Sequence, residues 1–173
     1  MYSIITQTIG FLGTGLLAAS YQCKSPRKLF FVQLCSNLSY IIHFLMLGAY
    51  SGCVNITLSF IRNCLLCSRK SWARWKGWPV LFVVAHVVAT VLTRQNFFSI
   101  LPCAGMIAMV LSSFTRNGKK VRLANIFVNS PAWLIYDIYT HSYSGIVCEM
   151  FCLVSTVISV IRFGWKALDA VEN

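Results

Sequence analysis

Polar and ionisable side chains stand inside long apolar runs of this chain, and they are the residues whose chemistry needs an explanation. They are Asn37, Asn55, Arg62, Asn129, Asp137 and Glu149. Such groups are costly in hydrocarbon, so each is a candidate for solute contact, charge pairing or proton exchange. No nucleophile and base constellation, phosphate-binding loop or zinc motif accompanies them. We therefore expect solute binding, and we expect the chain not to be an enzyme.

Two amides are each followed by an aromatic residue about one helical turn later. Tyr40 follows Asn37 and Trp133 follows Asn129, so each pair is predicted to share a helix face. An aromatic floor with amide donors suits a small polar metabolite. An intramembrane amide also often bonds only to a neighbouring helix, and that interpretation stays open for each asparagine.

The charged residues have more than one interpretation. Arg62 either extends its side chain to the membrane surface, pairs with an acid or contacts solute. Asp137 is close enough to the predicted outer interface to be solvated. Glu149 lies deep in an apolar run, so it must be paired, protonated or facing a water-filled cavity. We favour a cavity-facing carboxyl group that binds a proton or a cationic part of the solute.

Composition sets the class of protein that must position these groups. Of the 173 residues, 57% are hydrophobic and 11% are charged, with a mean hydropathy of +0.69. These values exclude an ordinary water-soluble domain and predict several membrane-spanning helices. The net charge of +11 comes from short basic clusters between apolar runs. This pattern indicates membrane topology and a lipid bilayer partner, and not nucleic-acid binding.

The apolar runs predict seven spans, at residues 3–22, 29–47, 50–68, 78–93, 98–115, 121–140 and 143–163. Alternate connections carry the basic residues, which are Lys24, Arg27, Lys28, Arg69, Lys70, Arg74, Lys76, Arg116, Lys119, Lys120, Arg122, Arg162 and Lys166. The intervening connections carry only Arg94. The positive-inside rule then places the N-terminus outside and the C-terminus in the cytoplasm. The fourth run is the weakest, but without it the cluster from Arg116 to Arg122 would lie outside.

An internal duplication organises these spans. Tyr50-Ser51-Gly52 recurs as Tyr143-Ser144-Gly145, and the same offset superimposes apolar runs and basic loops. Two parallel copies of three helices need one linking span between them. The sequence thus predicts an all-α polytopic membrane protein with a 3+1+3 arrangement. The expected parts are a first bundle at 1–68, a basic loop and linker helix at 69–97, and a second bundle with a short tail at 98–173.

The pattern resembles the MtN3/SWEET and PQ-loop superfamily of seven-span proteins, and more closely the YgjV-type family of bacterial inner-membrane proteins. The residues that carry the closer likeness are Gln33, His43-Phe44, Gly48, Tyr50, Ile61-Arg62 and the basic loop from Arg69 to Arg74. The resemblance implies residence in the bacterial inner membrane and transport of a small-molecule solute by alternating access. A seven-span binding or sensing protein without net transport is the alternative.

The SWEET likeness also implies site residues. In that family an asparagine of the third helix and its partner in the seventh contact the substrate; Asn55 matches the first, and its counterpart in the duplication is Cys148, beside Glu149. The second asparagine has no match. The chain also departs from the family by lacking a Pro-Gln dipeptide, and Pro102 and Pro131 stand opposite Ile9 and Leu38. Proline hinges in both halves are therefore not expected here.

The remaining motifs predict packing. The eight cysteines are scattered, and only Cys64 and Cys67 have the spacing of metal ligands, so neither a metal nor another cofactor is expected. His43 and His86 are interpreted as helix-packing groups. Gly10, Gly13 and Gly15 predict a face for close helix contact. Whether copies of the chain form a homo-oligomer stays open.

Overall fold

The computed structural model describes residues 2–48, 50–68, 70–93, 97–139 and 143–168, and all regular elements in these ranges are helical. The α-helices are α1 (Tyr2–Ser20), α2 (Pro26–Leu47), α3 (Tyr50–Cys67), α4 (Trp78–Thr93), α5 (Ile100–Phe114), α6 (Gly118–Ala124), α7 (Ser130–Tyr139) and α8 (Tyr143–Leu168). Short helical turns lie at η1 (Ser71–Arg74), η2 (Phe97–Ser99) and η3 (Asn125–Asn129). Each of the seven predicted apolar runs overlaps one helix or one continuous series of helical turns.

The sixth of these helices is continuous from Gly118 to Tyr139 but changes its winding in the middle. Its three parts are α6, the π turn η3 and α7, and the amide of Ser130 bonds back to the carbonyl of Asn125. Pro131 follows directly and has no N–H to donate to the turn before it. The widened π turn just before the proline allows the helix to continue through Pro131 without the missing bond.

Several helix boundaries follow from local capping chemistry. The Ser25 side chain accepts a bond from the Lys28 amide, Pro26 takes the first position of α2, and Gly48 ends that helix at a φ of 68°. Asn117 caps α6 by accepting from the amides of Lys119 and Lys120. Gly164 has a φ of 73°, so α8 turns sharply one residue after the predicted end of the last span.

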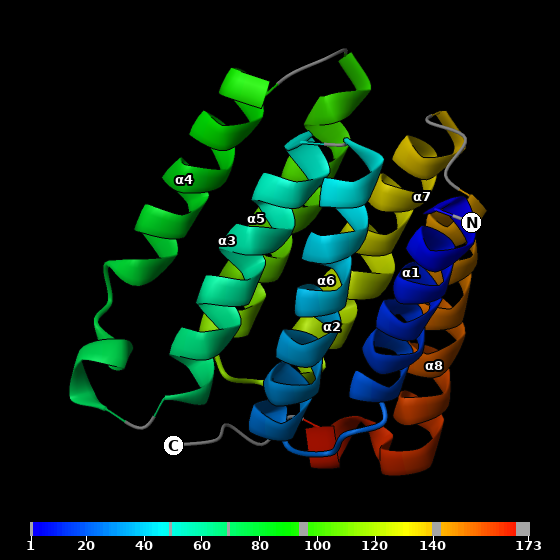
Figure 1. The fold of residues 1–173 in the computed structure, drawn as a ribbon. Helices are drawn as coiled ribbons and strands as arrows, with labels where there is room; N and C mark the ends of the chain where they lie inside the picture. The colour runs from blue at the N-terminus through cyan, green and yellow to red at the C-terminus, as the bar shows by residue number, and fades with distance from the viewer. Residues whose placement is uncertain (1, 49, 69, 94–96, 140–142, 169–173) are drawn as a thin grey trace.

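The helices pack in a ring in which each half has the same order. In the first half α2 lies between α1 and α3, and in the second half the helix from α6 to α7 lies between α5 and α8. The helix pairs that pack most extensively across the two halves are α1 with α8 and α3 with α5. Helix α4 packs outside the ring against α3 and α5, as Figure 1 shows.

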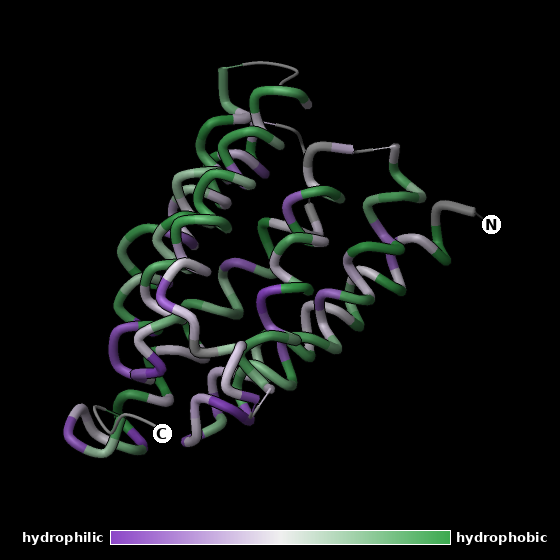
Figure 2. Tube along the Cα trace, turned by 90° about the vertical axis from the view of Figure 1, so that its left-hand side faces the viewer, coloured by the Kyte–Doolittle hydropathy of each residue, from purple (hydrophilic) through white to green (hydrophobic). Residues whose placement is uncertain are grey.

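The ends of the molecule differ in character. In Figure 1 the connections after α1, after α3 and between α5 and α6 lie at the same end as the close of α8, and α1 begins at the opposite end. The basic clusters lie in these connections or directly after them, and the connections themselves contain Lys24, Lys70 and Arg116. Figure 2 shows hydrophobic colouring along the helices and more hydrophilic colouring in the segments at this end. The basic residues thus gather at one end of the helical ring.

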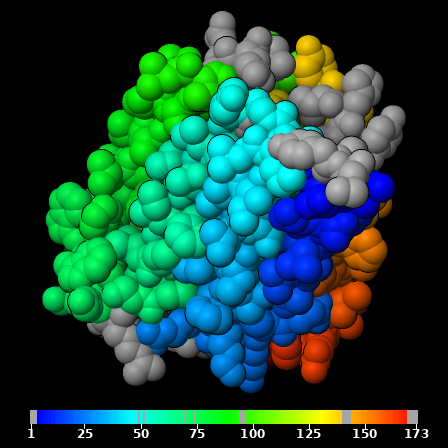
Figure 3. All heavy atoms as spheres, viewed as in Figure 1, coloured from blue at the N-terminus to red at the C-terminus, as the bar shows by residue number. Residues whose placement is uncertain are grey.

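Large hydrophobic side chains cover the outside. The face in Figure 3 is formed mainly by α1, α2, α3 and α4, with part of α8 beside α1. Exposed residues of the first four helices include Phe31 and Leu92, which are 59% and 79% exposed. Three helical segments are long and apolar enough to cross a membrane: Pro26–Leu47, Phe97–Phe114 and Ser144–Leu168. Shorter apolar helices are Ile4–Ser20, Gly52–Cys67 and Trp78–Thr93. An apolar exterior around a polar interior is the arrangement expected in a bilayer.

The glycines of α1 explain how closely it approaches α2. A Cβ added to Gly10 would come within 2.8 Å of the His43 ring, and one added to Gly13 within 3.1 Å of the Tyr40 ring. Gly15 has open space around it. The predicted small-residue face is therefore confirmed at Gly10 and Gly13, and Gly15 lies outside the contact.

Candidate functional site

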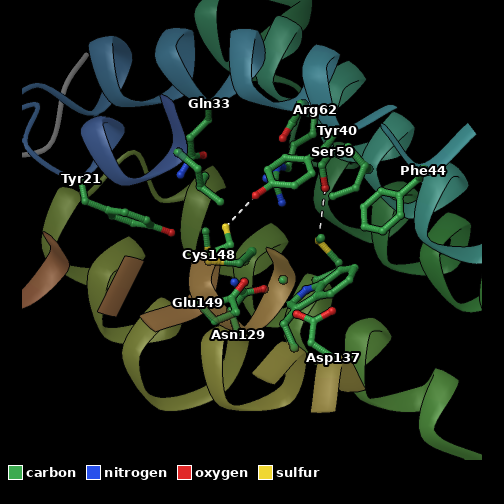
Figure 4. Close-up of a pocket in the computed structure, with 17 residues that line it drawn as sticks. Tyr21, Gln33, Tyr40, Phe44, Ser59, Arg62, Asn129, Asp137, Cys148 and Glu149 are labelled. Carbon is green, nitrogen blue, oxygen red and sulfur yellow. Dashed lines mark hydrogen bonds between the residues drawn. The ribbon is translucent and has the colours of Figure 1, made fainter. Parts of the chain in front are cut away.

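A cavity lies in the middle of the ring, between the two halves of the chain (Figure 4). Its walls come from α1, α2, α3, α5, η3, α7 and α8. Eight of the nine site residues that the sequence predicts line it: Asn37, Tyr40, Arg62, Asn129, Trp133, Asp137, Cys148 and Glu149. Residues separated by more than a hundred positions in the chain thus meet around one space.

Helical spacing explains why α2 contributes a continuous polar and aromatic wall. Gln33, Asn37, Tyr40 and Phe44 recur at intervals of four, three and four, so they lie along one face of the helix. The same rule places Asn129, Trp133 and Asp137 on one face of the helix that runs through η3 and α7. Gln33 and Phe44 are cavity residues that this spacing could have found, by extending the pair Asn37 and Tyr40 one turn in each direction.

Tyr40 connects three helices across the cavity. Its hydroxyl group donates to the Cys148 sulfur at 2.7 Å, and it lies 2.8 Å from the Thr14 hydroxyl group. The first bond, drawn in Figure 4, joins α2 of the first half to α8 of the second. Tyr40 and Cys148 therefore form a contact between the halves in the middle of the protein, beside Glu149.

Arg62 brings a positive charge into the cavity wall. Its side chain is 3% exposed, so it does not extend to the surface as one interpretation of the sequence expected. Its Nε donates to the Asn63 side-chain oxygen at 3.3 Å, and its Nη1 is buried without a hydrogen-bond partner. A buried guanidinium group with an unused donor is costly unless an acceptor enters the cavity.

Two acidic residues lie on the opposite side. Glu149 on α8 is 7% exposed, and its Oε2 is buried without a hydrogen-bond partner. Asp137 is 4% exposed and so is not the solvated surface residue that its position in the sequence indicated. A Cβ at Gly145 would collide with the Asp137 carboxylate, which places that group against the first turn of α8. The positive end of a helix dipole stabilises a carboxylate in this position.

Asn55 is the predicted site residue that the structure places elsewhere. Its side-chain oxygen lies 2.8 Å from the Nδ1 of His86, in the contact between α3 and α4, and both residues are buried. The cavity face of α3 instead consists of Ile56, Ser59 and Arg62. One residue along a helix is a rotation of about 100°, which is enough to turn Asn55 from that face toward α4.

Both predicted packing histidines have such a role. His86 bonds to Asn55, and the Nδ1 of His43 lies 2.8 Å from the carbonyl oxygen of Thr6 on α1. Within the described ranges, no three His, Cys, Asp or Glu side chains are grouped so that they could hold a metal ion.

Arg122 is the residue whose role the sequence did not reveal. It belongs to a basic cluster, yet its side chain is 0% exposed. Its Nη2 donates to the carbonyls of Tyr21 and Cys23, its Nη1 to the carbonyl of Gly118 and its Nε to Ser159. Arg122 thus ties the segment after α1 to α6 and α8 at the basic end of the ring. Lys120 belongs to the same basic cluster but is exposed. Arg122 differs from it because the carbonyls of a distant segment, at Tyr21 and Cys23, accept its hydrogen bonds.

Comparisons with known proteins give one match. Residues 4–167 match the sequence model of the family described as Imp-YgjV, bacterial inner membrane protein. No curated protein and no solved structure matches the chain. The match covers nearly the whole chain, including every residue that lines the cavity.

Proposed function

Because the chain belongs to the Imp-YgjV family of bacterial inner membrane proteins, we propose that it is a transporter or facilitator that moves a small polar solute through the central cavity by alternating access. The observation that carries the proposal is the cavity itself, which both halves of a membrane protein line with buried polar and charged groups. Groups of this kind inside a membrane protein are usually functional, because their desolvation opposes folding.

The proposed architecture is the seven-span 3+1+3 arrangement with parallel repeats. An offset of 93 residues relates the starts of α3 and α8, at Tyr50 and Tyr143. The same offset places α1 on α5 and α3 on α8. The packing of α1 against α8 therefore corresponds to the packing of α5 against α3, and both pairs are in contact. Such a pseudo-twofold ring, with the linker α4 outside it, resembles SWEET-like transporters, in which binding occurs at the repeat interface.

The contacts between the halves indicate how access could alternate. At the basic end, Arg122 binds the carbonyls of Tyr21 and Cys23, and the Gln22 side chain donates to the Ser155 carbonyl at 2.6 Å. These bonds hold that end together in this conformation. Opening the cavity there requires the halves to separate and the bonds to break, whereas the helices within each half can move as a unit.

The proposed orientation gives a topology prediction. The basic end should face the cytoplasm, because alternate connections concentrate the Lys and Arg residues there. Reporter fusions after residues 72, 118 and 173 are expected to give cytoplasmic signals, and fusions near 49, 95 and 142 to give outside signals. A cytoplasmic signal at 95 together with an outside signal at 118 would remove α4 as a span and contradict the 3+1+3 arrangement.

Transport itself is tested with purified protein in proteoliposomes. We expect saturable uptake of one class of solute from a panel of sugars, amino acids, organic acids and amines, measured by mass spectrometry of the vesicle contents. Vesicles without protein are the control for leakage. Saturable binding of a solute without net uptake would contradict transport and identify the chain as a binding or sensing protein.

A further inference from the structure

The cavity holds one cation and two acids, and their arrangement indicates what kind of ligand fits. Arg62 on α3 makes its hydrogen bond to Asn63 and forms no ion pair with Asp137 or Glu149, the two acids within the described ranges. Its Nη1 and the Oε2 of Glu149 are both buried without a hydrogen-bond partner. The cavity therefore presents an unused donor of a cation and an unused acceptor of an acid on different walls.

Asp137 differs from Glu149 in its surroundings. Its carboxylate lies against the first turn of α8 at Gly145, where the helix dipole stabilises negative charge. Glu149 lies one turn further along the same helix, away from that terminus. Arg62 and Glu149 are therefore the two charges that a ligand has to compensate.

We propose that the cavity binds a small zwitterion of the amino-acid class, whose carboxylate bonds to Arg62 and whose ammonium group bonds to Glu149. This inference rests on the proposed transport function and specifies its substrate class. A neutral sugar would leave both buried charges uncompensated. An organic acid would compensate only Arg62, and an amine only Glu149, so each would retain the desolvation cost of one ion.

Arg62 and Glu149 lie at different depths, which agrees with the absence of an ion pair between them. Arg62 lies 12 residues after Tyr50 at the start of α3, and Glu149 lies six residues after Tyr143 at the start of α8. In parallel helices this difference is about 9 Å of depth, at 1.5 Å per residue. The nitrogen and carboxylate oxygen of an amino acid are about 3 Å apart. Two charge-assisted hydrogen bonds of about 2.8 Å each let such a ligand bridge a donor and an acceptor atom that are about 8–9 Å apart.

The rest of the wall can receive an apolar substituent. Ile56, Met106 and Met109 line the cavity with Trp133, and Ser59 donates to the Met106 sulfur at 3.2 Å. Methionine side chains adapt to ligands of different shape. The charges would therefore fix the amino and carboxylate groups, while the sulfur and aromatic surfaces accept side chains of several sizes.

The test measures binding to the purified full-length protein with three zwitterions, glycine, serine and leucine. Each is compared with the analogue that lacks the amino group (acetate, 3-hydroxypropanoate and 4-methylpentanoate) and with the one that lacks the carboxylate (methylamine, ethanolamine and 3-methylbutylamine). Glucose is the neutral probe. We expect at least one zwitterion to bind about tenfold or more tightly than both of its analogues, as loss of one buried charge contact predicts. If no zwitterion exceeds both analogues, the proposal is wrong.

Two variants locate each contact. Arg62→Gln should weaken the bound zwitterion about tenfold or more but leave its amine analogue unchanged, and Glu149→Gln should weaken the zwitterion but leave its carboxylate analogue unchanged. Equal losses for all probes in both variants would contradict the assigned contacts.

Binding of a zwitterion without uptake in proteoliposomes would contradict transport and leave the ligand class standing. Saturable glucose uptake without zwitterion binding would contradict the proposed ligand class and leave the transport function standing.

Discussion

Arg122→Met is expected to lower the free energy of unfolding by roughly 3–5 kcal/mol, because it leaves several buried acceptors without a donor at about 1–3 kcal/mol each. Arg122 is fully buried and satisfies the carbonyls of Tyr21, Cys23 and Gly118 as well as the Ser159 hydroxyl group. Methionine fills much of the volume but donates no hydrogen bond, so three carbonyls lose a donor. In a thermal unfolding measurement in detergent we expect a decrease in Tm of about 10 °C.

Two further variants separate geometry from charge. Lys120→Met removes the same charge from an exposed position of α6 and should leave the Tm nearly unchanged. Arg122→Lys keeps the charge, but an ammonium group cannot reach four acceptors in the fork geometry of a guanidinium group, so it should recover only part of the loss. Equal Tm values for Arg122→Met and Lys120→Met would show that the network contributes nothing.

The positions of the helices could be predicted from the sequence because they depend on local signals. Apolar runs of sufficient length, the cap at Ser25 and the glycine at Gly48 each act over a few residues. The π turn before Pro131 was not predicted, although the proline itself marked the place. A proline removes one hydrogen bond, but packing against α5 and α8 decides whether the helix kinks, ends or widens.

The candidate site could be predicted in composition but only partly in geometry. Hydropathy identifies polar residues inside a run, yet it cannot tell which neighbouring helix each one faces when most of the run is apolar. This is why Asn37 and Glu149 line the cavity while Asn55 bonds to His86 of the linker helix. Arg122 shows the same limit in a basic loop, since its partners are carbonyls of a segment about 100 positions earlier.

Glu149 connects the cavity to the pH of the medium. Its carboxyl group shares the cavity with Asp137 and Arg62, and the titratable groups near it include Cys148 and Cys152 on α8, Tyr40 on α2 and Tyr21 in the segment after α1. Only the ionised form of Glu149 can pair with an ammonium group. Acidification that protonates it should therefore decrease uptake.

Glu149→Gln is accordingly expected to reduce zwitterion uptake about tenfold or more and to remove the pH dependence of what remains, measured in proteoliposomes from about pH 5 to pH 8. Glutamine keeps the size of the side chain and a hydrogen-bonding oxygen but not the charge. Glu149→Asp retains the charge on a shorter side chain and should keep the pH dependence at lower uptake. Met150→Leu, at an exposed position of the same helix, is the control for incorporation and folding. Unchanged uptake and pH dependence in Glu149→Gln would leave Glu149 with a packing role, because a carboxylate that binds the solute cannot be replaced by an amide without effect.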